Sequence, residues 1–210
     1  VSDWRLDAVT DLKGVTVDPT WGSFYGMFRN GRYAGTLHVP ALAAVQPDAC
    51  YNASNLEAVE LGSNTVVTSI GAQAFKNCSS LARIRLRGGR DLQVAADAFE
   101  GTKNLKVLEF TFKVPNDPTA VDNMLAGTTE EVTASANPPV IYASRKLGWT
   151  SGGIANIRPP TDAERAARPA WVPSGRSCLG VWQTATGARK AWVVHSPSKD
   201  DPPALLIIIR

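Results

Sequence analysis

Hydrophobic residues recur at a fixed spacing through the middle of the chain. Three segments share one register: AVQPDACYNASNLEAVEL, SIGAQAFKNCSSLARIRL and QVAADAFEGTKNLKVLEF. Equivalent residues lie 25 and then 24 positions apart in six columns, which include Leu56, Leu81 and Leu105, then Val59, Ile84 and Leu108, and Cys50, Phe75 and Phe99. A period of this length indicates repeats that are each too small to bury an apolar face alone. Because stacked neighbours supply the missing core, the sequence predicts a solenoid that is α/β or mainly β.

Each copy ends in the pattern Leu-x-x-Val-x-Leu, which predicts a short strand because residues two apart point to the same side of a pleated chain. Stacked copies then form a parallel sheet. A small residue and a bulkier one precede each strand, as in Ala74 and Phe75, and are expected to supply the opposite wall of the core. Asn52, Asn77 and Gly101 follow as turn residues.

The phrase AF-x-x-C-x-x-L-x-x-I-x-L, clearest over residues 74–86, resembles the BspA-like class of leucine-rich repeats. The resemblance is strong over residues 45–110 and weak to about residue 149. It implies an exported or cell-surface protein that takes part in adhesion or protein recognition and is not an enzyme. Two departures stand out, because Cys50 replaces the expected aromatic residue and only the second copy carries the cysteine, Cys78.

The flanking segments define the predicted domain boundaries. Residues 1–39 form an N-terminal cap, in which Asn30-Gly31 predicts a type I′ turn and a β-hairpin over residues 23–39. Residues 40–149 hold the array and a degenerate last copy. In that copy Asp117 and Pro118 begin a short helix with Met124 and Leu125 on its apolar face, Gly127 ends it, and residues 139–142 form a final strand.

The C-terminal part of the chain does not continue the repeat pattern. Residues 150–177 read as a linker that contains one short helix, with a capping box of Thr161 and Glu164 and a stop before Pro169. Residues 178–210 are predicted to form a small β-rich segment. There CLGVWQ and KAWVVH form two strands with a turn near Gly187, and ALLIII at residues 204–209 forms a third.

Composition narrows the partner classes. The chain has 210 residues and a net charge of +3, which does not call for nucleic acid as a partner. No apolar run approaches the roughly 20 residues that cross a bilayer. Three cysteines do not make a disulfide framework, so Cys50 and Cys78 are expected to be buried free thiols, while a bridge to Cys178 stays open. The first residue is Val1, which fits either a cleaved export signal or a trimmed chain.

The polar residues of the sequence form no recognisable catalytic motif. The two histidines, His38 and His195, have no spaced partner of the kind that zinc sites use. Phosphate-binding glycine loops, nucleophile elbows and dinucleotide fingerprints do not occur in the sequence. The expectation is therefore a protein without a metal ion, a cofactor or a catalytic residue.

Exposed positions of the predicted strands supply the candidate binding residues. These form three columns: Ala58, Arg83 and Val107, then Glu60, Arg85 and Glu109, then Gly62, Arg87 and Thr111. Neighbouring strands lie about 4.8 Å apart, so Arg85 is expected between two carboxylates. Two interpretations remain open. The charges form a solvated ladder, or the arginines bind an acidic protein ligand.

An aromatic pair offers an alternative from another class of function. Trp182 and Trp192 face each other if the C-terminal turn is centred on Gly187. An exposed pair would make this segment a carbohydrate-binding module, whereas a buried pair would be part of the core. A concave pocket with polar residues around residues 178–209 would indicate a carbohydrate-binding or enzymatic role for the C-terminal segment.

Overall fold

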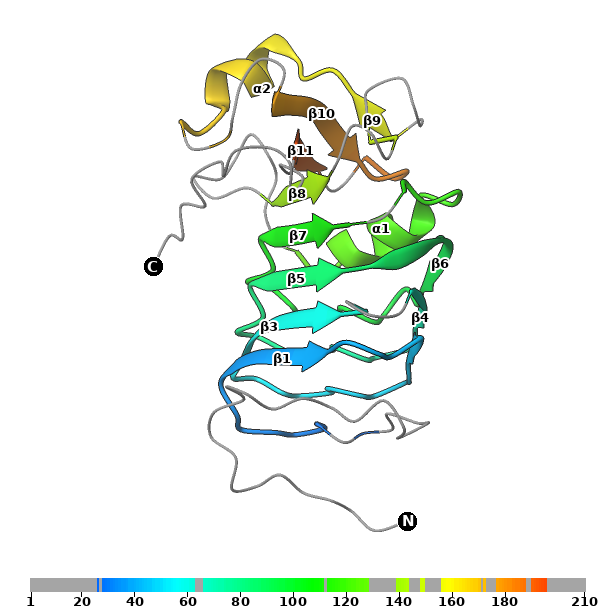
Figure 1. Ribbon diagram of the computed structural model, residues 1–210. Helices are drawn as coiled ribbons and strands as arrows, with labels where there is room; N and C mark the ends of the chain where they lie inside the picture. The colour runs from blue at the N-terminus through cyan, green and yellow to red at the C-terminus, as the bar shows by residue number, and fades with distance from the viewer. Residues whose placement is uncertain are drawn as a thin grey trace.

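The computed structural model describes residues 26, 28–62, 66–111, 113–128, 139–143, 148–149, 156–170, 172, 177–187 and 190–195. Over these residues the fold is mostly β, with two sheets and two short helices (Figure 1). The larger sheet has eight strands in the order β1(Gly35–Val39), β3(Leu56–Leu61), β5(Arg83–Leu86), β7(Val107–Phe110), β8(Val140–Ala143), β11(Lys190–His195), β10(Cys178–Gln183) and β9(Ile157–Arg158). The smaller sheet has three strands, β2(Ala44–Val45), β4(Val67–Ile70) and β6(Gly88–Val94).

The predicted repeat columns lie in register on adjacent parallel strands. Val59 is aligned with Ile84, and Ile84 with Leu108, on β3, β5 and β7. These three residues are at most 1% exposed and belong to one core. Phe75 and Phe99 stack within that core with ring centroids 5.1 Å apart. The predicted buried positions are confirmed for these strands, whereas most of the alternate positions are only partly exposed.

The turns before β1, β3, β5 and β7 share one backbone geometry. Asn30, Asn52, Asn77 and Gly101 have φ values of 56, 59, 61 and 78°. This left-handed region favours glycine and asparagine, which explains the residue types in the column. The turns also join neighbouring copies, because Asn77 donates a side-chain hydrogen bond to Asn52 Oδ1 at 3.0 Å.

The N-terminal segment is organised differently from the prediction. β1 pairs in parallel with β3, and residues 28–30 form a turn. Within the Asn30-Gly31 pair Asn30 alone has a positive φ, so the turn is not type I′. The amides of Phe28 and Asn30 donate to Ala49 and Tyr51, in the pattern that Cys50 and Asn52 repeat one copy later. The predicted hairpin is wrong over the described residues, and this segment is a further copy of the repeat.

The first copy does not show the repeat pattern in the sequence because aromatic residues form its core. The Tyr33 ring lies where a side chain at Gly31 would be, since a Cβ there would come within 2.1 Å of the ring. Tyr33 also meets Phe28 edge-to-face, with centroids 5.3 Å apart, and its hydroxyl donates to the Phe28 carbonyl at 2.6 Å. An aromatic pair therefore closes this turn of the core.

Both predicted helices are present. Helix α1(Thr119–Leu125) buries Met124 and Leu125, and Asp117 accepts a hydrogen bond from the Thr119 amide at 2.8 Å. Helix α2(Asp162–Ala167) has the predicted capping box between Thr161 and Glu164. No helix in the described part of the chain is both long and apolar enough to span a membrane.

The C-terminal strands extend the repeat sheet. β8 pairs in parallel with β7 and β11, and β10 pairs antiparallel with β11 and β9. The predicted hairpin of CLGVWQ and KAWVVH is thus confirmed, while the ALLIII run lies outside the described residues. Four consecutive residues of β10 and of β11 are buried, so these strands are covered on both faces.

A second small core accounts for that two-sided burial. Trp192 is in register with Val140 on β8 and Val181 on β10, so the three share one face of the sheet. They pack with Val172 and Val194 apart from the main core. This face is the continuation of the one that carries Arg83 on β5, since Arg83, Val107 and Val140 are also in register. The outer face therefore carries charged residues on the repeat strands. Beyond β8, on β11 and β10, the same face is apolar and buried.

All three cysteines are free, as expected for Cys50 and Cys78, and no bridge to Cys178 forms. Cys50 and Cys78 are fully buried in the main core. Burial raises the pKa of the Cys78 thiol to about 12. These two side chains therefore behave as small apolar residues.

Candidate recognition surface on the outer face of the sheet

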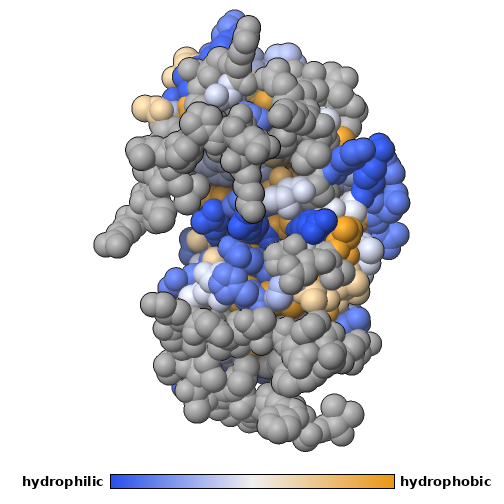
Figure 2. Space-filling model, in the orientation of Figure 1, coloured by the Kyte–Doolittle hydropathy of each residue, from blue (hydrophilic) through white to orange (hydrophobic). Residues whose placement is uncertain are grey.

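One row of polar side chains crosses five adjacent strands. His38 on β1, Glu60 on β3, Arg85 on β5, Glu109 on β7 and Tyr142 on β8 are in register. We call these five residues the charged row. Parallel pairing spaces them about 4.8 Å apart per strand and points them to one face. Figure 2 shows hydrophilic side chains across the middle of the face, at the height of β5 and β7 in Figure 1.

The arginines of this face converge on one carboxylate. Arg83 Nη2 lies 2.8 Å from Glu109 Oε2, and Arg85 Nε lies 3.3 Å from Glu109 Oε1. The side chain of Glu109 is 16% exposed, whereas those of Arg83 and Arg85 are 40% and 50% exposed. The two guanidinium groups thus share a single well-shielded negative charge, and their own surfaces remain open to solvent.

Glu60 is engaged at the other end of the row. Its Oε2 atom lies 3.0 Å from His38 Nδ1. The sequence predicted Arg85 between two carboxylates, and the strand register confirms that position. The sequence predicts His38 within a hairpin over residues 23–39 and therefore does not indicate its contact with Glu60. Glu109, and not Glu60, carries the ion pairs of the arginines described above.

Tyr142 ends the row where the outer face becomes covered. Its burial raises the pKa of the hydroxyl group, Arg83 lowers it and Glu109 raises it further. The strand register places Tyr142 beside Glu109, the partner of Arg83. Tyrosine is enriched at binding surfaces because it combines an apolar ring with a polar hydroxyl group.

A hollow lies beside the charged row at the ends of the strands. The amides of Gly62, Arg87 and Thr111 donate to the residues of the preceding strand in the same way, at 2.9, 3.0 and 3.2 Å, so the three occupy one level of the stack. Glycine and threonine leave space on either side of Arg87. The resulting depression has a volume of ≈ 400 Å³ and is lined by Glu60, Leu61, Arg85, Arg87 and Thr111.

The aromatic pair does not form a platform. Trp182 and Trp192 are both 0% exposed. Trp192 is paired with Val181, and Trp182 with Ala191, so the two rings lie on opposite faces of the hairpin. Trp182 packs against Trp149 with centroids 5.9 Å apart, and its Nε1 donates to Asp122 at 2.8 Å. Neither ring offers a face to a sugar, so the hypothesis of a Trp182–Trp192 sugar site is wrong.

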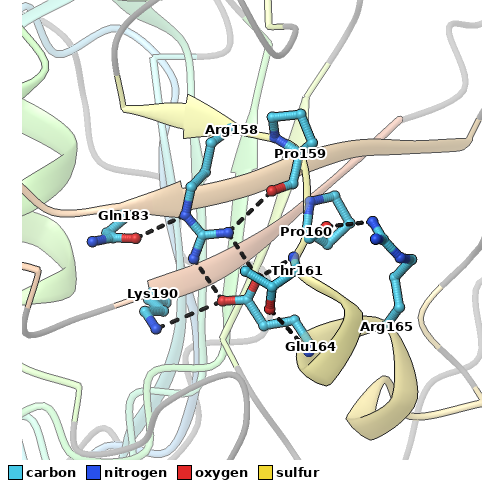
Figure 3. Close-up of polar contacts among 8 residues, drawn as sticks. All are labelled: Arg158, Pro159, Pro160, Thr161, Glu164, Arg165, Gln183 and Lys190. Carbon is cyan, nitrogen blue, oxygen red and sulfur yellow. Dashed lines mark hydrogen bonds and ion pairs between the residues drawn. The ribbon is translucent and has the colours of Figure 1, made fainter.

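A second polar cluster lies at the C-terminal end of the sheet (Figure 3). Glu164 is 1% exposed and accepts hydrogen bonds from Arg158 at 2.6 and 2.7 Å. The Thr161 amide adds a third at 2.8 Å, and Lys190 Nζ lies 3.6 Å away. The hydrogen bonds from Arg158, and after them those from Thr161, lower the pKa of Glu164 to about 2.

This cluster fastens α2 to the sheet. Arg158 comes from β9 and Lys190 from β11, and Arg158 also donates to Gln183 on β10 at 2.8 Å. The sequence revealed the capping box but not these partners, because they come from distant strands. A buried carboxylate with this many hydrogen-bond donors has a structural role, which here is to hold α2 against the sheet.

No group of three His, Cys, Asp or Glu side chains in the described ranges is arranged to hold a metal ion. Comparisons with models of protein families, with curated proteins and with solved structures found no match to this chain. The surface itself is therefore the best indication of function.

Proposed function

We propose that this chain is a non-enzymatic recognition module of the BspA-like leucine-rich-repeat type, a short solenoid that binds a protein partner on its outer strand face. The observation that carries the proposal is the charged row, which five strands hold in register. Long side chains held at a fixed spacing by a rigid sheet lose little conformational freedom on binding. Such a surface suits recognition of another macromolecule.

The surface also has the composition of a protein interface. It combines arginine, a tyrosine and small residues, and arginine and tyrosine are enriched where protein partners contact one another. The charges alternate along the row, from Glu60 to Arg85 to Glu109. Alternation favours a partner with a complementary pattern, because like charges in opposition are costly. An exported or surface-displayed location belongs to the same proposal and rests on the resemblance of residues 45–110 to the family.

Photocrosslinking tests this proposal directly. A photoreactive amino acid is placed at Ala58 or Thr36, which are partly exposed on the outer face, and at Gln93 on β6 as a control on the smaller sheet. Each variant is incubated with surface proteins of host or neighbouring cells, and products are identified by mass spectrometry. The proposal expects the same partner protein from both outer-face positions and not from Gln93. Crosslinks that do not depend on the labelled face would refute it.

A further inference from the structure

We propose that the outer face of β1, β3, β5 and β7 binds the same face of a second copy of this chain. This inference rests on the proposed recognition function and names the partner. The two copies are related by a two-fold axis that runs parallel to the strands, midway between β3 and β5. Strand β3 of each copy then lies opposite β5 of the other, and β1 lies opposite β7. Such an interface, in which both copies use the same surface, is the commonest kind in dimers.

The charged row is self-complementary under this axis. On the four repeat strands it runs His38, Glu60, Arg85 and Glu109, which is an alternating series of charges when His38 is protonated. Because the series has an even number of members, reversing it places each charge opposite one of the other sign. Glu60 then faces Arg85 of the second copy, and this central contact forms twice. The outer pairs bring His38 and Glu109 together, and complementary charges of this kind favour association.

Both central groups keep unused hydrogen-bonding capacity. Arg85 lies within ion-pair distance of Glu109, but its side chain donates no hydrogen bond among the described residues. Glu60 contacts His38 through Oε2, and no described residue donates a hydrogen bond to its Oε1 atom. The side chains of Arg85 and Glu60 are 50% and 36% exposed. A planar fork of donors and a carboxylate oxygen that matches it are therefore available to another molecule.

The neighbouring column of the outer face is complementary in size. It holds Thr36, Ala58, Arg83 and Val107 on the same four strands. The axis places Ala58 opposite Arg83 of the second copy, so the small side chain leaves room for the long one. Thr36 and Val107, which are similar in size, lie opposite each other. The charge of Arg83 needs no partner in the second copy, because Glu109 of its own chain lies 2.8 Å away.

The dimensions of the face set the strength of the dimer. Two sheets pack face to face about 10 Å apart with nearly aligned strands, a distance that opposed glutamate and arginine side chains can span. The hollow of ≈ 400 Å³ beside Glu60 and Arg85 gives these side chains room. Four strands about 4.8 Å apart make a face on the order of 20 Å by 15 Å, which is small for a protein interface. We therefore expect a weak dimer that is sensitive to salt.

Exchange of the central charges tests the inference on the full chain. Glu60→Arg places arginines opposite each other at both central contacts, and Arg85→Glu places glutamates opposite each other there. Each variant alone should fail to dimerise. An equimolar mixture of the two should form a mixed dimer, because every central pair then has opposite charges again. Lys76→Glu and Glu100→Lys are the matched controls, since this ion pair, with its charged atoms 2.9 Å apart, lies in the turns between the two sheets.

Sedimentation velocity at low salt, from about 10 µM to about 1 mM protein, measures the association. The wild type is expected to dimerise with a dissociation constant on the order of 100 µM, and the mixture to come within about threefold of that value. Both controls should match the wild type, and high salt should weaken the dimer. Circular dichroism checks that each variant is folded. Glu60→Gln and Arg85→Gln, each expected to weaken the dimer about fivefold, replace a charge reversal that does not fold.

Four results would overturn the inference: a wild type that stays monomeric, dimers of either charge reversal alone, a mixture that does not associate, or an equal loss in the controls. A foreign protein crosslinked from Ala58 and Thr36 to a chain that sediments as a monomer would refute the second copy alone. Crosslinks that form equally from Gln93 would instead refute the recognition function itself.

Discussion

Replacing Glu164 by Gln tests how the C-terminal strands are fastened. The substitution keeps the volume of the side chain and removes its charge. Arg158 then loses the carboxylate to which it donates two hydrogen bonds, and Lys190 loses its nearby negative charge. The side chain of Glu164 is 2% exposed, so solvent does not replace these partners.

The pKa of Glu164 gives the magnitude. It falls from 4.5 to about 2 in the folded protein. Each pKa unit corresponds to about 1.4 kcal/mol, so the interactions of the charged form contribute about 3 kcal/mol. Because the folded-state pKa lies below the unfolded value, this contribution is complete above about pH 4.5 and is lost as the pH falls toward 2.

Urea unfolding, followed by tryptophan fluorescence, measures the effect. At pH 7 the free energy of unfolding of Glu164→Gln is expected to be about 3 kcal/mol below that of the wild type. The gap should narrow steadily between pH 4.5 and 2. Asp162→Asn is the control, since this carboxylate is in the same helix and is 97% exposed, and its variant should unfold close to the wild type.

Two outcomes would refute the reasoning. A gap below about 1 kcal/mol at pH 7 would mean that the contacts to Arg158 and Thr161 do not stabilise the charged form of Glu164. A gap that does not change with pH would mean that lost packing, and not lost charge, destabilises the variant.

Two further predictions concern buried side chains. Trp182→Phe removes a hydrogen bond to Asp122. Trp192 Nε1 has no hydrogen-bond partner in the described part of the chain. Trp182→Phe should therefore lower the free energy of unfolding by about 1.5–3 kcal/mol more than Trp192→Phe does. Urea unfolding measures both, and an equal loss would contradict the assignment. Iodoacetamide at pH 8 should modify Cys178 in the native protein, because this side chain is only partly buried, although burial raises the pKa of its thiol too. Mass spectrometry should find Cys50 and Cys78 modified only after unfolding, because both are fully buried in the folded protein; modification of either in the native protein would contradict that burial.

The repeat core was predictable because its columns keep one spacing. Val59, Ile84 and Leu108 occupy equivalent places, and the parallel register follows from them. The first copy was not predictable because it is shorter than the others and the Tyr33 ring covers Gly31. A local asparagine-glycine signal then suggested a hairpin, and the tertiary contacts of β1 with β3 prevailed.

The candidate site was predictable in position but not in pairing. Strand alternation placed Glu60, Arg85 and Glu109 on one face, whereas the contacts of individual atoms depend on side-chain torsions that no sequence pattern encodes. The tryptophans show how sensitive such reasoning is to register. Trp182 pairs with Ala191 and not with Trp192, and a difference of one residue moves a side chain to the other face.

The pairing of β8 with β11 has a consequence for the order of folding. Neighbouring strands in the array are close in sequence, as Val59 and Ile84 are, whereas Val140 pairs with Trp192, more than twice as far along the chain. Closing a longer loop costs more chain entropy and slows the pairing. We therefore expect the array to form first and the C-terminal strands to dock onto it. Since β8 carries Tyr142 and pairs directly with β7, the charged row is expected to be complete within the array, before the C-terminal strands dock and cover the outer face beyond it.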